Sequence, residues 1–189
     1  MRIGIFGGTF NPVHNGHMSV AKEAIERLSL DNIVFVPAYI PPHKDTTELI
    51  SADDRYEMIE LAIGDNEDFH ISRFEIDRKK RSYSIETIAH FKEIYPLDAK
   101  LYFLIGADSS QELSEWKDID KLLGLCKFVV FDRPGFDKRL DYPNVESLDI
   151  TGVDISSTRV RENLKSNKSI TGLVPKQVED YIISHNLYR

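Results

Sequence analysis

Short apolar runs alternate along the chain with longer segments in which apolar residues recur at helical spacing. The apolar runs predict strands at residues 3–6, 33–37, 69–72, 100–105 and 127–131, with a further candidate strand at 145–148. The helical spacing predicts helices at about 16–28, 51–63, 84–94, 119–125, 156–164 and 175–184. Residues 73–82 hold a charged cluster at 77–81, in which Lys79 and Lys80 are interpreted as solvated loop residues.

This alternation of strand and helix predicts the α/β class. We expect a Rossmann-like, doubly wound parallel sheet in one domain over residues 1–189, with a short helical C-terminal part. In such a sheet the ligand lies beyond the carboxyl ends of the strands where the strand order reverses. The first and fourth strands have the clearest glycine punctuation, and they flank the reversal in the order 3-2-1-4-5. We therefore expect Gly7-Gly8 and Gly106-Ala107-Asp108 to converge on one cleft.

Composition narrows the function classes. Hydrophobic residues make up 41% and charged residues 29% of the 189 residues, an ordinary globular mixture. The net charge of −7 argues against non-specific nucleic-acid binding, which needs clustered positive charge. The chain shows no signal peptide and no apolar stretch of membrane-spanning length, so we expect a cytoplasmic protein without a membrane partner. The single cysteine, Cys126, excludes a disulfide within the chain and is predicted to be a buried strand residue.

Two histidines follow the first glycine pair. The stretch from Ile3 to His17 reads IGIFGGTFNPVHNGH, which places His14 and His17 at the start of a predicted helix. It has neither the dinucleotide Gly-x-Gly-x-x-Gly spacing nor the P-loop ending. Alone, a His-x-x-His pair is as typical of a helix cap or a metal pair as of a phosphate-binding site. After a strand and a Gly-Gly turn, at a helix N-terminus whose N–H groups favour anions, the pair favours phosphate binding.

A cluster of hydroxyl groups begins the helix predicted at 156–164. Ser156, Ser157 and Thr158 stand together, and Arg161 follows one turn later. Helix capping explains one of these hydroxyls but neither the cluster nor the arginine. Hydroxyl and N–H donors beside a guanidinium that can pair in a bidentate way suit a polyphosphate.

Both motifs resemble those of the nucleotidyltransferase superfamily that carries His-x-Gly-His and, near the C-terminus, Ser-x-x-x-x-Arg. The longer string around the histidines resembles the nicotinate mononucleotide adenylyltransferase family. Stretches similar to that family cover nearly the whole chain: Pro41-Pro42-His43-Lys44, residues 82–87, residues 105–109, Arg133-Pro134-Gly135 and Leu173-Val174-Pro175. The chain departs from the family at Asn11, where Asp is usual, at Ser84, where Thr is common, and at Lys117, where an aromatic residue is usual. We expect the Lys117 side chain to be solvated.

The resemblance implies a reaction and a set of roles. It implies adenylyl transfer from ATP to nicotinate mononucleotide, with Mg²⁺ carried by ATP. His14, His17 and Arg161 would be the catalytic residues, with His17 nearest the α-phosphate. Arg161 would also bind the β- and γ-phosphates, together with Ser156 and Thr158. The other substrate-binding residues that the resemblance implies are Gly7, Gly8, Thr9, Phe10, Lys44, Thr87, Gly106, Asp108, Trp116, Arg133 and Ser157.

Position alone leaves a structural alternative open for several of these residues. Asp108 is as typical of a helix N-cap as of a ribose ligand. Lys44 is typical of a solvated loop, Arg133 of a turn and Thr87 of a helix surface. A lone tryptophan is most often in a core, but Trp116 stands in a polar turn and is better placed to stack on a flat ring.

Three functions stay in competition at this stage. The first is the enzyme that converts ATP and nicotinate mononucleotide into deamido-NAD and pyrophosphate. The second is an adenylyltransferase for phosphopantetheine or nicotinamide mononucleotide, and the third is a non-catalytic nucleotide sensor. Two intact motifs argue against the sensor. We expect no metal held by protein side chains, and a homo-oligomer is compatible with the sequence.

Overall fold

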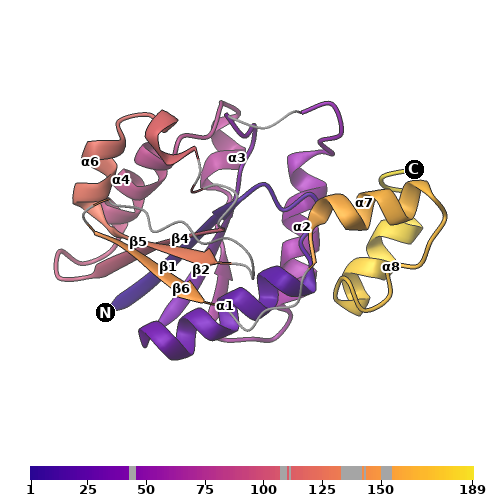
Figure 1. The fold of residues 1–189 in the computed structure, drawn as a ribbon, viewed down its shortest axis with the longest axis horizontal. Coiled ribbons are helices and arrows are strands. Elements are labelled where there is room, and N and C mark those ends of the chain that lie inside the picture. The colour runs from indigo at the N-terminus through magenta and orange to yellow at the C-terminus, as the bar shows by residue number, and fades with distance from the viewer. Residues whose placement is uncertain (43–45, 107–109, 111, 133–141, 143, 150–154) are drawn as a thin grey trace.

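The fold is built on one parallel β-sheet (Figure 1). The computed structural model describes residues 1–42, 46–106, 110, 112–132, 142, 144–149 and 155–189. The strands are β1 (Arg2–Gly8), β2 (Asn32–Pro37), β3 (Phe69–Ile71), β4 (Lys100–Gly106), β5 (Lys127–Asp132) and β6 (Val145–Asp149). They lie in the order β3-β2-β1-β4-β5-β6, and each neighbouring pair is parallel. This confirms the predicted α/β fold and the order 3-2-1-4-5, to which β6 adds an edge.

Helices cover both faces of the sheet. They are α1 (Asn15–Leu28), α2 (Ala52–Ile63), α3 (Phe74–Arg78), α4 (Ser84–Ile94), η1 (Leu113–Glu115), α6 (Ile119–Leu125), α7 (Ser157–Lys165) and α8 (Lys176–Ser184). Successive strand side chains point to opposite faces. Accordingly, Phe6 belongs to an apolar cluster shared with α1, α2, α7 and α8. Its neighbour Ile5 belongs to a second cluster, shared with α4 and α6.

The C-terminal helices extend one end of the molecule. Figure 1 shows α7 and α8 beyond the end of the sheet, next to α2. The pair is attached through α2, where the Tyr181 hydroxyl donates to Asp54 Oδ1 at 3.0 Å. The prediction of a single domain over residues 1–189 stays a prediction. None of the helices in the described part of the chain is long and apolar enough to cross a membrane.

Side-chain caps begin two of the helices. Ser51 Oγ accepts from the Asp54 N–H at 3.0 Å and caps the start of α2. Ser156 Oγ accepts from the Arg159 N–H at 3.1 Å and begins α7. The predicted helix starts are therefore confirmed to within one or two residues.

Two local expectations are wrong, and one short helix was not predicted. That helix is α3, which buries Glu75 and Ile76. Lys79 and Lys80 follow it, outside the helix and exposed, as predicted. Cys126 is buried but is not in a strand: it ends α6 and immediately precedes β5. The chain also does not turn at Gly7-Gly8, since β1 continues through Gly8 and the first left-handed residue is Phe10, with φ of 48°.

Candidate active site

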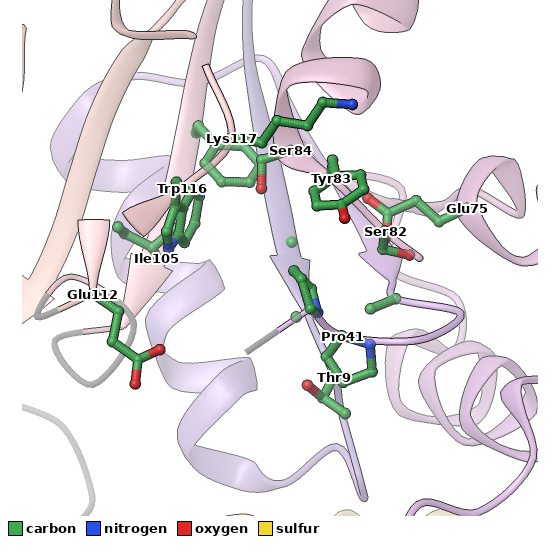
Figure 2. Close-up of a pocket in the computed structure, with 15 residues that line it drawn as sticks. Thr9, Pro41, Glu75, Ser82, Tyr83, Ser84, Ile105, Glu112, Trp116 and Lys117 are labelled. Carbon is green, nitrogen blue, oxygen red and sulfur yellow. The ribbon is translucent and has the colours of Figure 1, made fainter. Parts of the chain in front are cut away.

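A cavity opens at the carboxyl ends of the central strands. β1 pairs with β2 on one side and with β4 on the other, so the strand order reverses at β1, as predicted. The cavity has a volume of about 260 Å³. Figure 2 shows Trp116 and Glu112 on one side of it and Ser82 and Glu75 on the other. Its lining residues are Gly7, Gly8, Thr9, Ala38, Pro41, Pro42, Glu75, Ser82, Tyr83, Ser84, Phe103, Ile105, Glu112, Trp116 and Lys117.

The two glycines at the end of β1 are needed because aromatic rings pack directly on them. A Cβ atom at Gly7 would lie 2.9 Å from the Phe103 ring, and one at Gly8 would lie 2.8 Å from the Phe10 ring. Phe103 and Phe10 are both buried. The glycines therefore leave room for these two rings and leave backbone without side chains in the cavity lining, where a ligand can approach the main chain.

His14 and His17 form a reciprocal cap at the start of α1. The His14 N–H donates to His17 Nδ1 at 3.2 Å, and the His17 N–H donates to His14 Nδ1 at 3.3 Å. Their rings stack with centroids 3.7 Å apart, and His17 also meets the edge of Phe10. Because both Nδ1 atoms accept, a neutral ring carries its proton on Nε2. The cap thus fixes ring orientation and makes Nε2 the donor of each histidine.

The loop between β1 and α1 is held from several sides. Arg55 of α2, whose side chain is fully buried, donates to the Thr9 carbonyl at 2.8 Å and to the Tyr39 carbonyl at 3.0 Å. Burial lowers the pKa of Arg55 to about 10, which still leaves it charged at neutral pH. Asn11 donates from Nδ2 to the Glu48 carbonyl at 2.9 Å. These bonds fix the backbone at the point where it leaves the cavity.

The C-terminal motif lies against this same loop. Ser157 Oγ donates to the Pro12 carbonyl at 2.9 Å, and Arg161 donates from one terminal nitrogen to the Asn11 carbonyl at 3.0 Å. A Cβ atom at Gly16 would lie 3.4 Å from the Ile155 carbonyl oxygen. The N-terminus of α7 therefore lies beside the N-terminus of α1, although about 140 residues of chain separate them. The positive ends of the two helix dipoles therefore lie close together, which favours an anion near them.

Arg161 and Lys165 share one carboxylate. Glu48 Oε2 lies 3.1 Å from Arg161 Nε, and Glu48 Oε1 contacts Lys165 Nζ. Hydrogen bonds from Lys165 and Arg161 lower the pKa of Glu48, so it is ionised at neutral pH. Another terminal nitrogen of Arg161 lies 3.4 Å from Thr158 Oγ1. Two cations one helical turn apart thus converge on a single anion.

A buried carboxyl group supports the opposite wall of the cavity. Glu75 accepts hydrogen bonds from the hydroxyls of Thr87 and Ser82, and Ser82 Oγ in turn accepts from the Tyr39 N–H at 3.0 Å. Burial raises the pKa of Glu75, whereas the two hydroxyl donors lower it. The network connects α3, the start of α4 and the segment that follows β2.

Trp116 and Lys117 form the remaining wall. Trp116 packs edge-on against Phe103 and Phe128, with ring centroids 6.0 and 6.1 Å apart, and still reaches the cavity. We expected the Lys117 side chain to be solvated, but it has partners within the protein. Its Nζ lies 3.1 Å from Glu86 Oε1 and 4.5 Å from the centre of the Tyr83 ring. A flat surface and a cation therefore stand at one end of the cavity.

The structure brings together most of the predicted residues that it describes. Gly7, Gly8, Thr9 and Trp116 line the cavity. The predicted residues at the starts of α1 and α7 lie next to the loop between β1 and α1, which leads out of the cavity. Thr87 is buried rather than on a helix surface, and it bonds Glu75 instead of lining the cavity. Gly106 is the exposed last residue of β4. Lys44, Asp108 and Arg133 lie outside the described residues.

Arg55 and Glu75 support the candidate site, and neither was predicted from the sequence. Arg55 had a detectable signal, because it shares a helical stripe with the apolar residues Ala52, Met58 and Ile59. A charged side chain within a buried stripe needs partners. Glu75 had no such signal, because its partners come from distant segments.

Within the described residues, no group of three or more His, Cys, Asp or Glu side chains is arranged to hold a metal ion.

Comparison with known proteins agrees with this geometry. The chain matches the cytidylyltransferase-like family model over residues 5–163, which places it in that class. A probable nicotinate-nucleotide adenylyltransferase of Clostridium acetobutylicum is 42% identical over 97% of each chain. One from Shouchella clausii is 43% identical over 99% of this chain and 96% of its own. The chain therefore belongs to the nicotinate-nucleotide adenylyltransferase family, and the resemblance found in the sequence is confirmed.

Solved structures show the same fold. The nicotinic acid mononucleotide adenylyltransferase of Plasmodium falciparum, solved in complex with NaAD, superposes with a TM-score of 0.81. It is 21% identical and covers 99% of this chain and 97% of its own. The structure of that enzyme in complex with APC gives a TM-score of 0.80.

Proposed function

We propose that this protein transfers the adenylyl group of ATP to nicotinate mononucleotide, forming deamido-NAD and pyrophosphate in NAD biosynthesis. The observation that carries the proposal is the meeting of the His-x-Gly-His and Ser-x-x-x-x-Arg segments. They join at Ser157 and Pro12 and at Arg161 and Asn11, beside the cavity at the carboxyl end of β1. Family membership supports the same reaction, because the relatives carry that name.

The chemistry needs little from the side chains beyond position and charge. A 5′-phosphate oxygen of the mononucleotide attacks the α-phosphorus of ATP, and the bond from that phosphorus to the β-bridging oxygen breaks. Pyrophosphate leaves with the bonding electrons. The attacking phosphate is mostly dianionic near neutral pH, since its second pKa is about 6, so no general base is required. Catalysis then depends on orientation and on stabilising charge as it develops.

The paired helix starts suit the triphosphate. The Nε2–H donors of His14 and His17 would face the α-phosphate region, and the start of α7, with Ser156, Thr158 and Arg161, would hold the β- and γ-phosphates. The cavity between Tyr83 and Trp116 suits the pyridine ring of the mononucleotide. Mg²⁺ would arrive with ATP, because phosphate oxygens and water are its preferred ligands. A cytoplasmic setting and the absence of a nucleic-acid partner belong to the same proposal, and the net charge of −7 supports the latter.

Pyrophosphate release tests this assignment against its rivals. The purified protein is given Mg²⁺, ATP and one acceptor at a time: nicotinate mononucleotide, nicotinamide mononucleotide or phosphopantetheine. We expect the fastest release with nicotinate mononucleotide and none without an acceptor. Faster release with phosphopantetheine would identify the protein as a phosphopantetheine adenylyltransferase instead. ATP binding with no pyrophosphate from any acceptor would make it a sensor.

A further inference from the structure

The side chains of Glu48, Arg161 and Lys165 form a compact ion-pair group beside the proposed triphosphate site. Each oxygen of the Glu48 carboxylate contacts one cation: Oε2 contacts Arg161 Nε at 3.1 Å, and Oε1 contacts Lys165 Nζ. Arg161 and Lys165 are four residues apart in α7 and so lie on the same side of the helix. The carboxylate therefore marks a position at which both cations can reach one anion.

Arg161 has other contacts besides the one to Glu48. Its terminal nitrogens contact the Asn11 carbonyl at 3.0 Å and Thr158 Oγ1 at 3.4 Å, and its side chain is only 17% exposed. Lys165 is different, because its side chain is 49% exposed and Glu48 is its ion-pair partner. Arg161 thus sets the position of the shared anion, and the more exposed Lys165 side chain can adjust to reach the same anion.

Glu48 can leave this position without any movement of its backbone. Its carbonyl is bonded to Asn11 Nδ2 at 2.9 Å, which anchors the main chain, whereas its side chain is 46% exposed. Rotation of the side chain alone would free both cations. An exposed ion pair contributes little to stability, so exchange of Glu48 for a more highly charged anion is favourable.

We propose that Lys165 is a phosphate-binding residue and that the Glu48 carboxylate occupies the place that Lys165 and Arg161 offer to the terminal phosphate of ATP. The inference rests on the proposed function, because it extends the triphosphate site by one helical turn. The γ-phosphate has three oxygens and more negative charge than a carboxylate, so it can replace both contacts of Glu48. Glu48 then competes with ATP, and Lys165 contributes to ATP binding but not to the reaction at the α-phosphorus.

Two substitutions with opposite expected signs test the proposal. Lys165→Gln removes the cation, and we expect it to raise the KM for ATP about threefold to tenfold, the range for a lost charge-assisted contact at a half-exposed site. The kcat and the KM for nicotinate mononucleotide should change less than twofold. Glu48→Gln removes the competing charge and should lower the KM for ATP about twofold to fivefold. A stabilising ion pair without a ligand role would not produce this opposition of signs.

Lys168→Gln is the matched control. Lys168 is also an exposed lysine, three residues further along the chain, and its side chain makes no ion pair within the described part of the structure. The Lys168→Gln variant loses the same charge as Lys165→Gln, so a general electrostatic effect on the KM for ATP would appear in both variants. We expect its KM for ATP to stay within twofold of the parent. Binding of inorganic triphosphate, followed by calorimetry, should rank the four proteins in the same order.

The outcomes separate this proposal from the function on which it rests. If the parent protein neither binds ATP nor releases pyrophosphate, the proposed function fails. If the parent turns over normally but Lys165→Gln matches Lys168→Gln, the phosphate role of Lys165 is wrong. A Glu48→Gln variant that binds ATP or triphosphate more weakly would show that Glu48 supports the site instead of competing for it.

Discussion

The Tyr188 hydroxyl donates a hydrogen bond of 3.0 Å to Asn11 Oδ1, across 177 positions of sequence. The same amide donates from Nδ2 to the Glu48 carbonyl at 2.9 Å, and its Oδ1 lies 3.4 Å from the Ile50 N–H. Asn11 therefore uses both ends of its amide. An aspartate at this position would keep the acceptor but lose the donor to Glu48. The penultimate residue of the chain is thus tied to the loop between β1 and α1.

Tyr188→Phe should destabilise the protein by about 1 kcal/mol, the typical contribution of one hydrogen bond. Burial raises the pKa of Tyr188, so the hydroxyl stays protonated and acts as the donor over the working pH range. In a chain of this length the loss corresponds to a Tm lower by about 2–4 °C. Urea unfolding of parent and variant measures it.

Tyr95→Phe is the control for that measurement. The Tyr95 hydroxyl has no hydrogen-bond partner among the described residues, so its removal should change the free energy of unfolding by less than about 0.5 kcal/mol. Equal losses for the two variants would show that the bond to Asn11 contributes nothing specific.

His17→Ala should lose most of its kcat while the fold survives. The substitution removes a donor placed at the start of α1, and loss of one transition-state donor typically lowers the rate about 10²- to 10³-fold. It also removes one half of the reciprocal cap with His14, so a stability loss of about 0.5–2 kcal/mol is expected. His70→Ala, at an exposed histidine of β3, controls for the loss of an imidazole. Turnover near that of the parent in a folded His17→Ala protein would refute the catalytic role.

The main features of the fold and the position of the site were predictable because they depend on local patterns. Strand and helix spacing gave the sheet, and the reversal at β1 placed the cleft beside Gly7 and Gly8. The α3 helix was missed because it is short and contains charged residues typical of a loop. Lys117 was expected in solvent because its partner, Glu86, is 31 positions away on α4. The environment of such a residue is set by contacts between distant segments, and a single sequence does not specify those contacts.

Arg161→Lys should weaken the use of ATP although the charge is kept. Arg161 makes three contacts at once, to Asn11, Thr158 and Glu48, through three different nitrogens. A lysine has one nitrogen and cannot reproduce this planar fork. We expect kcat/KM for ATP to fall at least tenfold. An unchanged kcat/KM would exclude Arg161 from the triphosphate site.

Glu75→Gln should alter the pH dependence of stability. Burial, the largest cause, raises the pKa of Glu75 above its ordinary value of 4.5. A group whose pKa is higher in the folded state binds protons more tightly there, so its contribution to stability is complete below pH 4.5. That contribution falls as the pH rises through the folded-state pKa. The parent should therefore lose stability relative to Glu75→Gln on going from pH 4.5 to pH 8. A difference that is constant with pH, measured by urea unfolding, would contradict this.

The protein should prefer the acid mononucleotide to the amide. Tyr83, Ser84 and Trp116 surround one end of the cavity, where main-chain N–H groups and a hydroxyl can donate. A carboxylate accepts from every such donor, whereas a carboxamide presents its NH₂ group to one of them. Each charge-assisted hydrogen bond contributes roughly 1.5–3 kcal/mol, so two of them give a preference of order 10²-fold or more.

Lys117 offers a way to separate this preference from simple charge attraction. Its ammonium group is paired with Glu86 at 3.1 Å, which partly neutralises its field at the cavity. Lys117→Gln should therefore lower the acid-to-amide ratio of kcat/KM by less than about fivefold, within the range for a half-exposed ion pair. Parallel kinetics with the two mononucleotides at one ATP concentration measure the ratio in both proteins. Equal kcat/KM values in the parent would exclude specific recognition of the carboxylate. Loss of the whole preference in Lys117→Gln would assign it to the lysine charge instead of the hydrogen-bond donors around Tyr83, Ser84 and Trp116.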